Sequence, residues 1–157
     1  MKKYFKKCEE FTICGAIGFK GEIIAETSVE NQTMFQIVIK GNGRVGKAFD
    51  PNYIELVEGQ IHDVSNLVGS NRVYQPDEDF KVYGFNALNP DDKWSFKKIT
   101  DSFRGDDKSW LICFDGSPEI NGVTMKSLDY AKLSDKDYSV KINDGLVGVF
   151  TKLDYVF

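Results

Sequence analysis

The hydrophobic and polar positions along the chain follow the short period of β-strands. No long stretch repeats apolar residues at i, i+3, i+4 and i+7, the spacing that an amphipathic helix requires. Apolar and β-branched residues instead gather in short runs that Gly, Asn and Asp separate, which is typical of strands joined by turns. The runs that we predict to be strands are 11–19, 22–27, 33–40, 53–57, 80–85, 94–99, 109–114, 118–120, 138–142 and 146–152. This spacing is typical of β-sandwiches and barrels, so the pattern predicts an all-β protein of about ten strands.

The strand pattern continues along the chain without a linker or a repeat of fixed period. The length of 157 residues suits one domain with a single core, and we expect one domain over 1–157. The segment Val64–Val73 interrupts the strand pattern, and we expect it to form one short helical turn.

Composition and charge exclude several classes of protein. Hydrophobic residues make up 41% of the chain, which excludes disorder for most of it. The net charge is −4, and this argues against general nucleic-acid binding, which needs a basic surface to neutralise phosphates. His62 is the single histidine, so no metal site can use two histidines of one chain.

The start of the chain, residues 1–10, is locally basic. Lys2, Lys3, Lys6 and Lys7 surround an aromatic pair there. Such a segment could contact a membrane surface or a nucleic acid, but we expect a solvated or packed terminus.

The cysteines and the absence of targeting patterns point to the cytoplasm. Cys8, Cys14 and Cys113 are an odd number and form no C-x-x-C pair, so we expect reduced, buried thiols in an intracellular protein. No apolar signal region and no run of 18 apolar residues occur, so we expect neither a signal peptide nor a membrane span. If the protein is encoded by a phage, its place would be the host cytoplasm.

A succession of turns in the last third of the sequence carries a family resemblance. A Gly turn at Asp115-Gly116 is followed by an Asn121-Gly122 hairpin, a polar step at Leu128-Asp129, a loop over 134–137 and the turn 143–145 before a terminal strand. This order resembles the second half of a cupin-type double-stranded β-helix, and the resemblance covers residues 80–152. It implies a jelly-roll barrel or sandwich, and it implies a homodimer, because cupin-like folds often pair through edge strands.

The sequence departs from the cupin pattern at the metal ligands. The first cupin motif carries two histidines and a glutamate, and the matching residues 93–98 carry none of them. The second motif ends in a histidine, and residues 134–138 have none. The resemblance therefore implies a barrel without metal or cofactor, and we expect a binding protein rather than an enzyme.

The segment Gly41–Gly46 matches the spacing G-x-G-x-x-G, which in dinucleotide-binding proteins opens a helix. Here Pro51 and Asn52 follow too soon for a helix, so we expect a β-turn from which Arg44 protrudes. The planar guanidinium of Arg44 could then anchor a phosphate or a carboxylate.

The leading hypothesis for function is a small-molecule-binding protein. Its ligand would be anionic, either a nucleotide or a sugar derivative, and would lie in the barrel mouth among cations, aromatic rings and polar groups facing the interior. The predicted ligand-binding residues are Arg44, Tyr83, Trp94, Phe96, Arg104, Tyr130 and Lys132. The aromatic residues could equally fill the core.

Two other classes of function remain open. The composition, rich in Lys, Asp and Asn and poor in Arg, resembles that of phage accessory proteins, which act by binding or inhibiting a partner protein. A metal-independent isomerase or epimerase would use His62 and a tyrosine as base and acid. Asp63 follows His62 directly, but neighbouring residues of a strand point to opposite faces, so a plain loop or surface histidine is the simpler interpretation.

Overall fold

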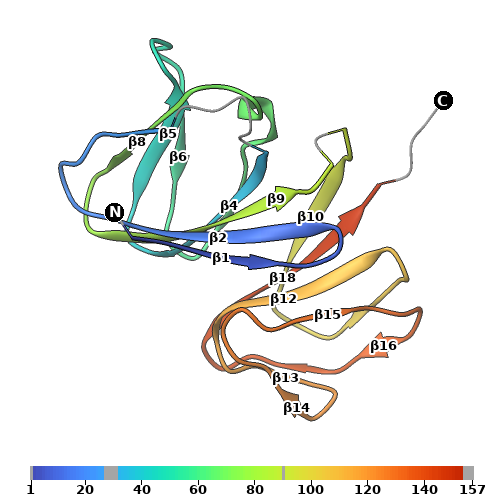
Figure 1. The fold of residues 1–157 in the computed structure, drawn as a ribbon. Coiled ribbons are helices and arrows are strands. Elements are labelled where there is room, and N and C mark those ends of the chain that lie inside the picture. The colour runs from blue at the N-terminus through green and yellow to red at the C-terminus, as the bar shows by residue number, and fades with distance from the viewer. Residues whose placement is uncertain (1, 27–31, 90, 154–157) are drawn as a thin grey trace. The chain divides into compact units, whose positions relative to one another are not determined.

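The computed structural model describes residues 2–26, 32–89 and 91–153, and Figure 1 shows their course. These residues form eighteen antiparallel strands and one short 3-10 helix. The chain divides into two compact units, Met1–Pro90 and Asp91–Phe157, which we call unit 1 and unit 2. The boundary falls within the range 80–152 that carries the cupin resemblance.

Unit 1 consists of two sheets. The first has the order β1-β2-β9-β4-β7, with strands β1 (Lys2–Lys7), β2 (Phe11–Gly18), β4 (Thr33–Lys40), β7 (Ile61–Asp63) and β9 (Phe80–Ala87). The second has the order β3-β8-β5-β6, with strands β3 (Ile24–Glu26), β5 (Gly43–Lys47), β6 (Tyr53–Leu56) and β8 (Arg72–Pro76). The 3-10 helix η1 (Ser65–Leu67) lies between β7 and β8, within the segment predicted to form a helical turn. The basic start of the chain is an edge strand of the first sheet.

The core of unit 1 lies between these sheets. Alternate residues of each strand point inward, because successive side chains of a strand leave on opposite faces. The buried cluster draws on both sheets and on η1, and its members are Val38, Val45, Leu56, Val64, Leu67, Tyr74, Phe80 and Val82. Val45 and Tyr74 face each other in the β5–β8 register, which fixes the outward direction of Arg44 and Gly46 beside them.

Unit 2 consists of one four-stranded sheet and two smaller sheets. Its main sheet has the order β10-β18-β12-β15, with strands β10 (Trp94–Ile99), β12 (Ser109–Gly116), β15 (Tyr130–Lys132) and β18 (Gly145–Lys152). Two small sheets, β11-β16 and β14-β13-β17, use strands β11 (Phe103–Arg104), β13 (Glu119–Ile120), β14 (Val123–Thr124), β16 (Asp137–Tyr138) and β17 (Val140–Lys141). Its core cluster is Ile99, Leu111, Cys113, Ile120, Met125, Leu133, Tyr138, Val147 and Val149.

The predicted all-β architecture is confirmed, and each of the ten predicted runs overlaps at least one strand. The higher number of strands has a physical reason. The additional ones are short or carry polar residues, as in Gly43–Lys47 and Arg72–Pro76, so the hydrophobic pattern does not mark them. Gly41 and Asn42 form a turn that leads into β5, and the segment opens no helix, as predicted. Arg44 lies within β5 and is half-buried, so the prediction that it protrudes from the turn is wrong.

Candidate functional site

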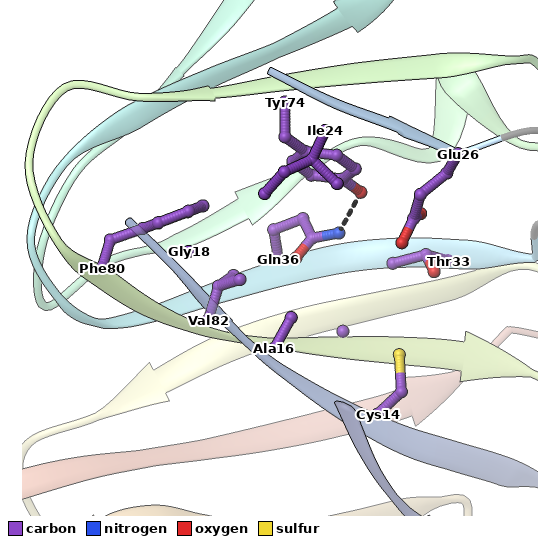
Figure 2. A pocket seen from close by; sticks show the side chains of 11 residues that line it. Cys14, Ala16, Gly18, Ile24, Glu26, Thr33, Gln36, Tyr74, Phe80 and Val82 are labelled. Atoms are coloured by element: carbon purple, nitrogen blue, oxygen red, sulfur yellow. Dashed lines mark hydrogen bonds between the residues drawn. The ribbon is translucent and has the colours of Figure 1, made fainter. Parts of the chain in front are cut away.

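Unit 1 encloses a cavity of about 40 Å³ between its two sheets, and Figure 2 shows its lining. A water molecule needs roughly 10–15 Å³ of such space, so the cavity can take a group of about three water-sized parts. Strands β2, β4 and β9 line one side, and β3 and β8 line the other. The lining residues are Cys14, Ala16, Gly18, Ile24, Glu26, Thr33, Gln36, Tyr74, Phe80, Val82 and Gly84.

Small residues on two neighbouring strands create this space. Cys14, Ala16 and Gly18 alternate along β2, so three small residues follow one another on the inner face. On β9, a Cβ atom at Gly84 would lie 3.0 Å from the Thr33 Cγ2 atom and 3.1 Å from the Cys14 Sγ atom. A larger side chain at Gly84 would therefore press against the wall of the cavity.

The Tyr74 hydroxyl is the central polar group of the cavity. It accepts hydrogen bonds from Gln36 Nε2 at 2.8 Å and from Arg72 Nη1 at 3.5 Å. Both bonds use the oxygen as an acceptor, so its own proton is available for an acceptor inside the cavity. Burial raises the pKa of Tyr74 to about 12, although the nearby Arg72 charge lowers it, and the phenol stays protonated at neutral pH.

A buried arginine lies behind this tyrosine. Arg72 is fully buried, and its guanidinium donates to the carbonyl oxygens of Thr33 at 2.7 Å and Leu67 at 3.3 Å, besides the Tyr74 hydroxyl. All three acceptors are neutral. The hydrogen bonds offset part of the cost of burying the charge, and they tie β8 to β4 and to η1.

The end of the cavity that lies away from Phe80 and Gly18 is polar and partly exposed. Thr33 Oγ1 donates to Asn86 Oδ1, and Asn86 Nδ2 donates to Cys14 Sγ at 3.3 Å. Cys14 and Glu26 are both partly exposed and belong to the rim. Figure 2 places Cys14, Glu26 and Thr33 at one end and Phe80 with Gly18 at the other, so the cavity has a polar end and an apolar end.

Arg44 lies at a separate groove on the outer face of the second sheet of unit 1. The groove has a volume of about 370 Å³ and is lined by Arg44, Gly46, Lys47, Phe49, Asp50, Pro51, Tyr53, Val73 and Gln75. Tyr83 lies elsewhere: it sits between the cavity-lining residues Val82 and Gly84 on β9 and points to the other face, with Lys81 Nζ 5.4 Å from its ring centroid.

Four of the predicted residues share one face of the main sheet of unit 2. The strand register places Phe96 beside Phe150, and Trp110 lies between Phe150 and Lys132. Trp94 is two residues from Phe96 and Tyr130 is two residues from Lys132, so both share this face. The Trp110 ring lies 5.9 Å from the Tyr130 ring and 5.3 Å from Lys132 Nζ. Their strand neighbours Leu111 and Val149 belong to the core of unit 2, so these residues lie on the face of the sheet opposite to that core. The predicted ligand site would have needed them to face the barrel interior.

Two further candidates are engaged in local interactions. Arg104 is exposed, and its guanidinium pairs with Asp135 at 3.0 Å and with Asp137 at 3.5 Å. His62 Nε2 accepts a hydrogen bond from the Val57 backbone N–H at 2.8 Å. Partial burial lowers the pKa of His62, in spite of the opposing contact with the Val57 carbonyl oxygen. The histidine therefore anchors the loop before β7 in its neutral form.

Two features are absent from the part of the chain that the structure describes. Within 2–26, 32–89 and 91–153, no three His, Cys, Asp or Glu side chains are arranged so that they could hold a metal ion. No helix among these residues is long and apolar enough to cross a bilayer.

Comparison with solved structures identifies the fold. The chain resembles a cupin 2 conserved barrel domain protein from Leptotrichia buccalis (TM-score 0.54, 12% identity, covering 98% of this chain and 88% of that one). It also resembles YhaK from Escherichia coli (TM-score 0.61, 8% identity, 98% and 86%) and YhhW from Escherichia coli (TM-score 0.58, 12% identity, 92% and 81%). No family model matches the sequence, and no curated protein sequence matches it either.

The protein thus has a cupin-like fold, as the turn pattern predicted. The likeness extends over nearly the whole chain and not only over residues 80–152. The fold occurs here in a sequence with a single histidine, so the histidine ligands of the cupin motifs are missing.

The prediction of site residues missed the cavity lining of unit 1. Glu26, Thr33 and Gln36 lie in strands that the pattern did predict, but nothing in a single strand shows which polar residue meets Tyr74 across the barrel. One signal was present: Cys14, Ala16 and Gly18 place small residues on one face of a strand, which leaves space beside them.

Proposed function

We propose that the cavity of unit 1 binds one hydroxyl-bearing end of a small molecule of the sugar-derivative class, and that the rest of the molecule lies at the partly exposed rim, because a cavity of about 40 Å³ takes only about three water-sized groups. The observation that carries this proposal is the Tyr74 hydroxyl, which accepts two hydrogen bonds and so keeps its own proton available for an acceptor in the cavity. A hydroxyl group of the ligand can accept that proton and donate its own to the Glu26 carboxylate at the rim. Pockets that combine an apolar lining with a few placed polar groups are typical ligand sites.

Charge favours a neutral ligand group inside this cavity. Glu26 is a lining residue, whereas the Arg72 guanidinium is held behind Tyr74 and Thr33 by three hydrogen bonds. Glu26 brings a carboxylate to the rim, and a hydroxyl group of the ligand adds no further negative charge beside it. The apolar end, with Ile24, Phe80 and Val82, would contact the carbon skeleton of the ligand.

The test is a thermal-shift measurement with glycerol, ribose, glucose and glucose 6-phosphate, each at about 10 mM. We expect at least one of the four to raise the unfolding midpoint, because a ligand that binds only the folded state stabilises it. Ala16→Leu fills the cavity with three additional carbon atoms and should abolish the shift, and Glu26→Gln should weaken binding about tenfold.

Two controls isolate the cavity. Ala25→Leu adds the same atoms at an exposed position on the opposite face of β3, and Glu55→Gln removes a carboxylate on the exposed face of β6. Both should keep the shift of the unchanged protein. The proposal is wrong if none of the four compounds stabilises the protein, or if Ala16→Leu retains the full shift.

The other predicted functions stay predictions. His62 lies outside the cavity lining and its Nε2 atom is occupied by Val57, so the geometry does not favour an isomerase built on that residue. The inhibitor of phage type, the protein partner and the homodimer also stay predictions. We infer a cytoplasmic protein, and the three free thiols Cys8, Cys14 and Cys113 support a reducing compartment.

A further inference from the structure

The outer face of the second sheet of unit 1 carries a groove that the proposed function does not use. Core residues Val45 and Tyr74 point inward, so their strand neighbours Arg44, Gly46 and Val73 point outward. Gly46 has no side chain, and this lowers the floor of the groove between Arg44 and Tyr53. The volume of about 370 Å³ lies in the range of sites for small organic ligands, which begins at roughly 300 Å³.

Arg44 lies in this groove without a hydrogen-bond partner on its Nε atom. That nitrogen is buried and makes no hydrogen bond to any described residue. The guanidinium carbon lies 5.2 Å from the centroid of the Tyr53 ring, so the ring holds the cation in place without using its N–H donors. A buried donor without a partner is costly, and a phosphate or carboxylate that accepts from Arg44 removes this cost.

Arg44 is the cation that an anion in this groove would meet. Lys47 also belongs to the lining, but its side chain leaves β5 on the same side as Val45, whereas Arg44 leaves on the opposite side. Asp50 is the acidic residue of the lining, and Glu55 lies opposite Arg44 in the β5–β6 register. The Asp50 carboxylate already accepts a hydrogen bond from the Asn52 backbone N–H at 2.9 Å, which fixes it within the hairpin loop. Arg44 thus presents its charge between Glu55 of β6 and Gln75 of β8.

An aromatic ring stands exposed at the edge of the groove. Phe49 is fully exposed and has a φ of 64°, a left-handed backbone conformation that is unfavourable for a bulky residue. The hairpin between β5 and β6 thus holds an apolar ring in solvent at a backbone cost. Such strain is found where a residue has a binding role, and a flat ligand ring could stack on this one.

We propose that this groove binds a nucleoside monophosphate. The phosphate would accept hydrogen bonds from the Arg44 guanidinium, and the base would stack on Phe49 or on the exposed edge of Tyr53. The site is separate from the barrel cavity, with which it shares no lining residue.

Isothermal titration calorimetry with adenosine monophosphate, adenosine and inorganic phosphate tests this site. We expect the monophosphate to bind at least about tenfold more tightly than either part alone, because charge and stacking contribute together. Arg44→Gln should weaken its binding by about tenfold or more. Arg44→Lys, which keeps the charge but loses the planar fork, should recover only part of it. Phe49→Gly should weaken the binding of the monophosphate and leave the binding of inorganic phosphate unchanged.

Two control variants distinguish binding in this groove from an effect of net charge and from binding in the barrel cavity. Lys126→Gln removes one exposed positive charge from unit 2 and should leave binding unchanged, which excludes an effect of net charge. Ala16→Leu fills the barrel cavity and should also leave it unchanged, so a failure of the barrel proposal does not affect this one. The inference is overturned if the monophosphate does not bind at about 1 mM, or if Arg44→Gln binds it as tightly as the unchanged protein.

Discussion

The Tyr74 oxygen has a structural role in the fold, and the proposed function gives it a binding role as well. The same hydroxyl that offers its proton to the cavity also accepts from Gln36 and from the fully buried Arg72. The charge of Arg72 is thereby distributed over three neutral acceptors from β4, η1 and β8. A ligand group bound to Tyr74 would complete a network that the fold itself requires.

Tyr74→Phe should destabilise the protein by about 1–3 kcal/mol, because buried donors of Gln36 and Arg72 lose their acceptor. Urea unfolding followed by circular dichroism measures this change. Tyr53→Phe is the matched control, because the Tyr53 ring is exposed and its removal of a hydroxyl should change the free energy of unfolding by less than about 0.5 kcal/mol. Equal effects of both substitutions would contradict the role assigned to the Tyr74 oxygen.

His62 gives a prediction about pH. Its pKa is lowered in the folded protein by partial burial, so the unfolded chain binds more protons than the native state below the ordinary pKa of about 6.5. Stability should therefore fall as the pH drops from about 7 through this value, and level off once the folded histidine is also protonated.

Proton NMR of the untagged protein tests this prediction directly, because His62 is the single histidine and gives an unambiguous imidazole signal. We expect its titration midpoint below about 6.5. In His62→Gln the loss of stability between about pH 7 and pH 5 should be smaller than in the unchanged protein. A midpoint above the ordinary value would show that Val57 does not hold the neutral ring.

At the scale of elements, the β5–β6 hairpin holds Phe49 in a backbone conformation that a bulky side chain does not favour. The left-handed backbone of Phe49 suits glycine far better than phenylalanine. Phe49→Gly should raise the free energy of unfolding by about 0.5–1 kcal/mol, after the entropy of a more flexible unfolded chain is subtracted. Phe49→Ala removes the ring but keeps most of the backbone strain, so chemical denaturation should show little change. If Phe49→Ala stabilised the protein as much as Phe49→Gly, the unfavourable free energy would come from the exposed ring and not from the backbone conformation.

Individual elements also show how far sequence patterns reach. The runs at 33–40 and 94–99 coincide with β4 and β10, because their apolar residues follow the pattern of strands. β4 is buried over most of its length, whereas β10 is buried only at Trp94 and Ile99. The strand Arg72–Pro76 was not predicted, because it begins with an arginine, which is rarely buried. Arg72 is buried here because it donates hydrogen bonds to the carbonyl oxygens of Leu67 and Thr33, and Thr33 lies 39 residues away along the chain. Contacts of this kind depend on tertiary structure and leave no local signal.

The candidate sites divide in the same way. The sequence singled out Arg44 as a residue that a turn exposes, whereas the structure places it in β5, beside a groove to which Gly46 of the same strand contributes. The barrel cavity was not predicted, because it needs β2, β3, β4, β8 and β9 to be placed around one space. Sequence patterns can thus single out one charged residue, whereas the strand that carries it and a lining drawn from five strands become known only from the fold.

At the scale of the whole molecule, a cupin-like fold is combined with a histidine content that cannot supply the family's metal ligands. The chain has one histidine, and its Nε2 atom already binds the Val57 backbone N–H. Within the described residues, no three His, Cys, Asp or Glu side chains converge on one point, and divalent transition metals bind weakly without such a set.

Elemental analysis of the purified protein should therefore find less than about 0.1 zinc, iron or manganese ion per chain, since tight binding needs three or four converging ligands. The unfolding midpoint should be the same with EDTA and with added zinc or manganese, because a metal that bound only the native state would raise it. A copurifying metal near one ion per chain, together with a lower midpoint in EDTA, would contradict this expectation. Loss of such a metal in His62→Gln would then identify the histidine as a ligand and displace Val57 as its partner.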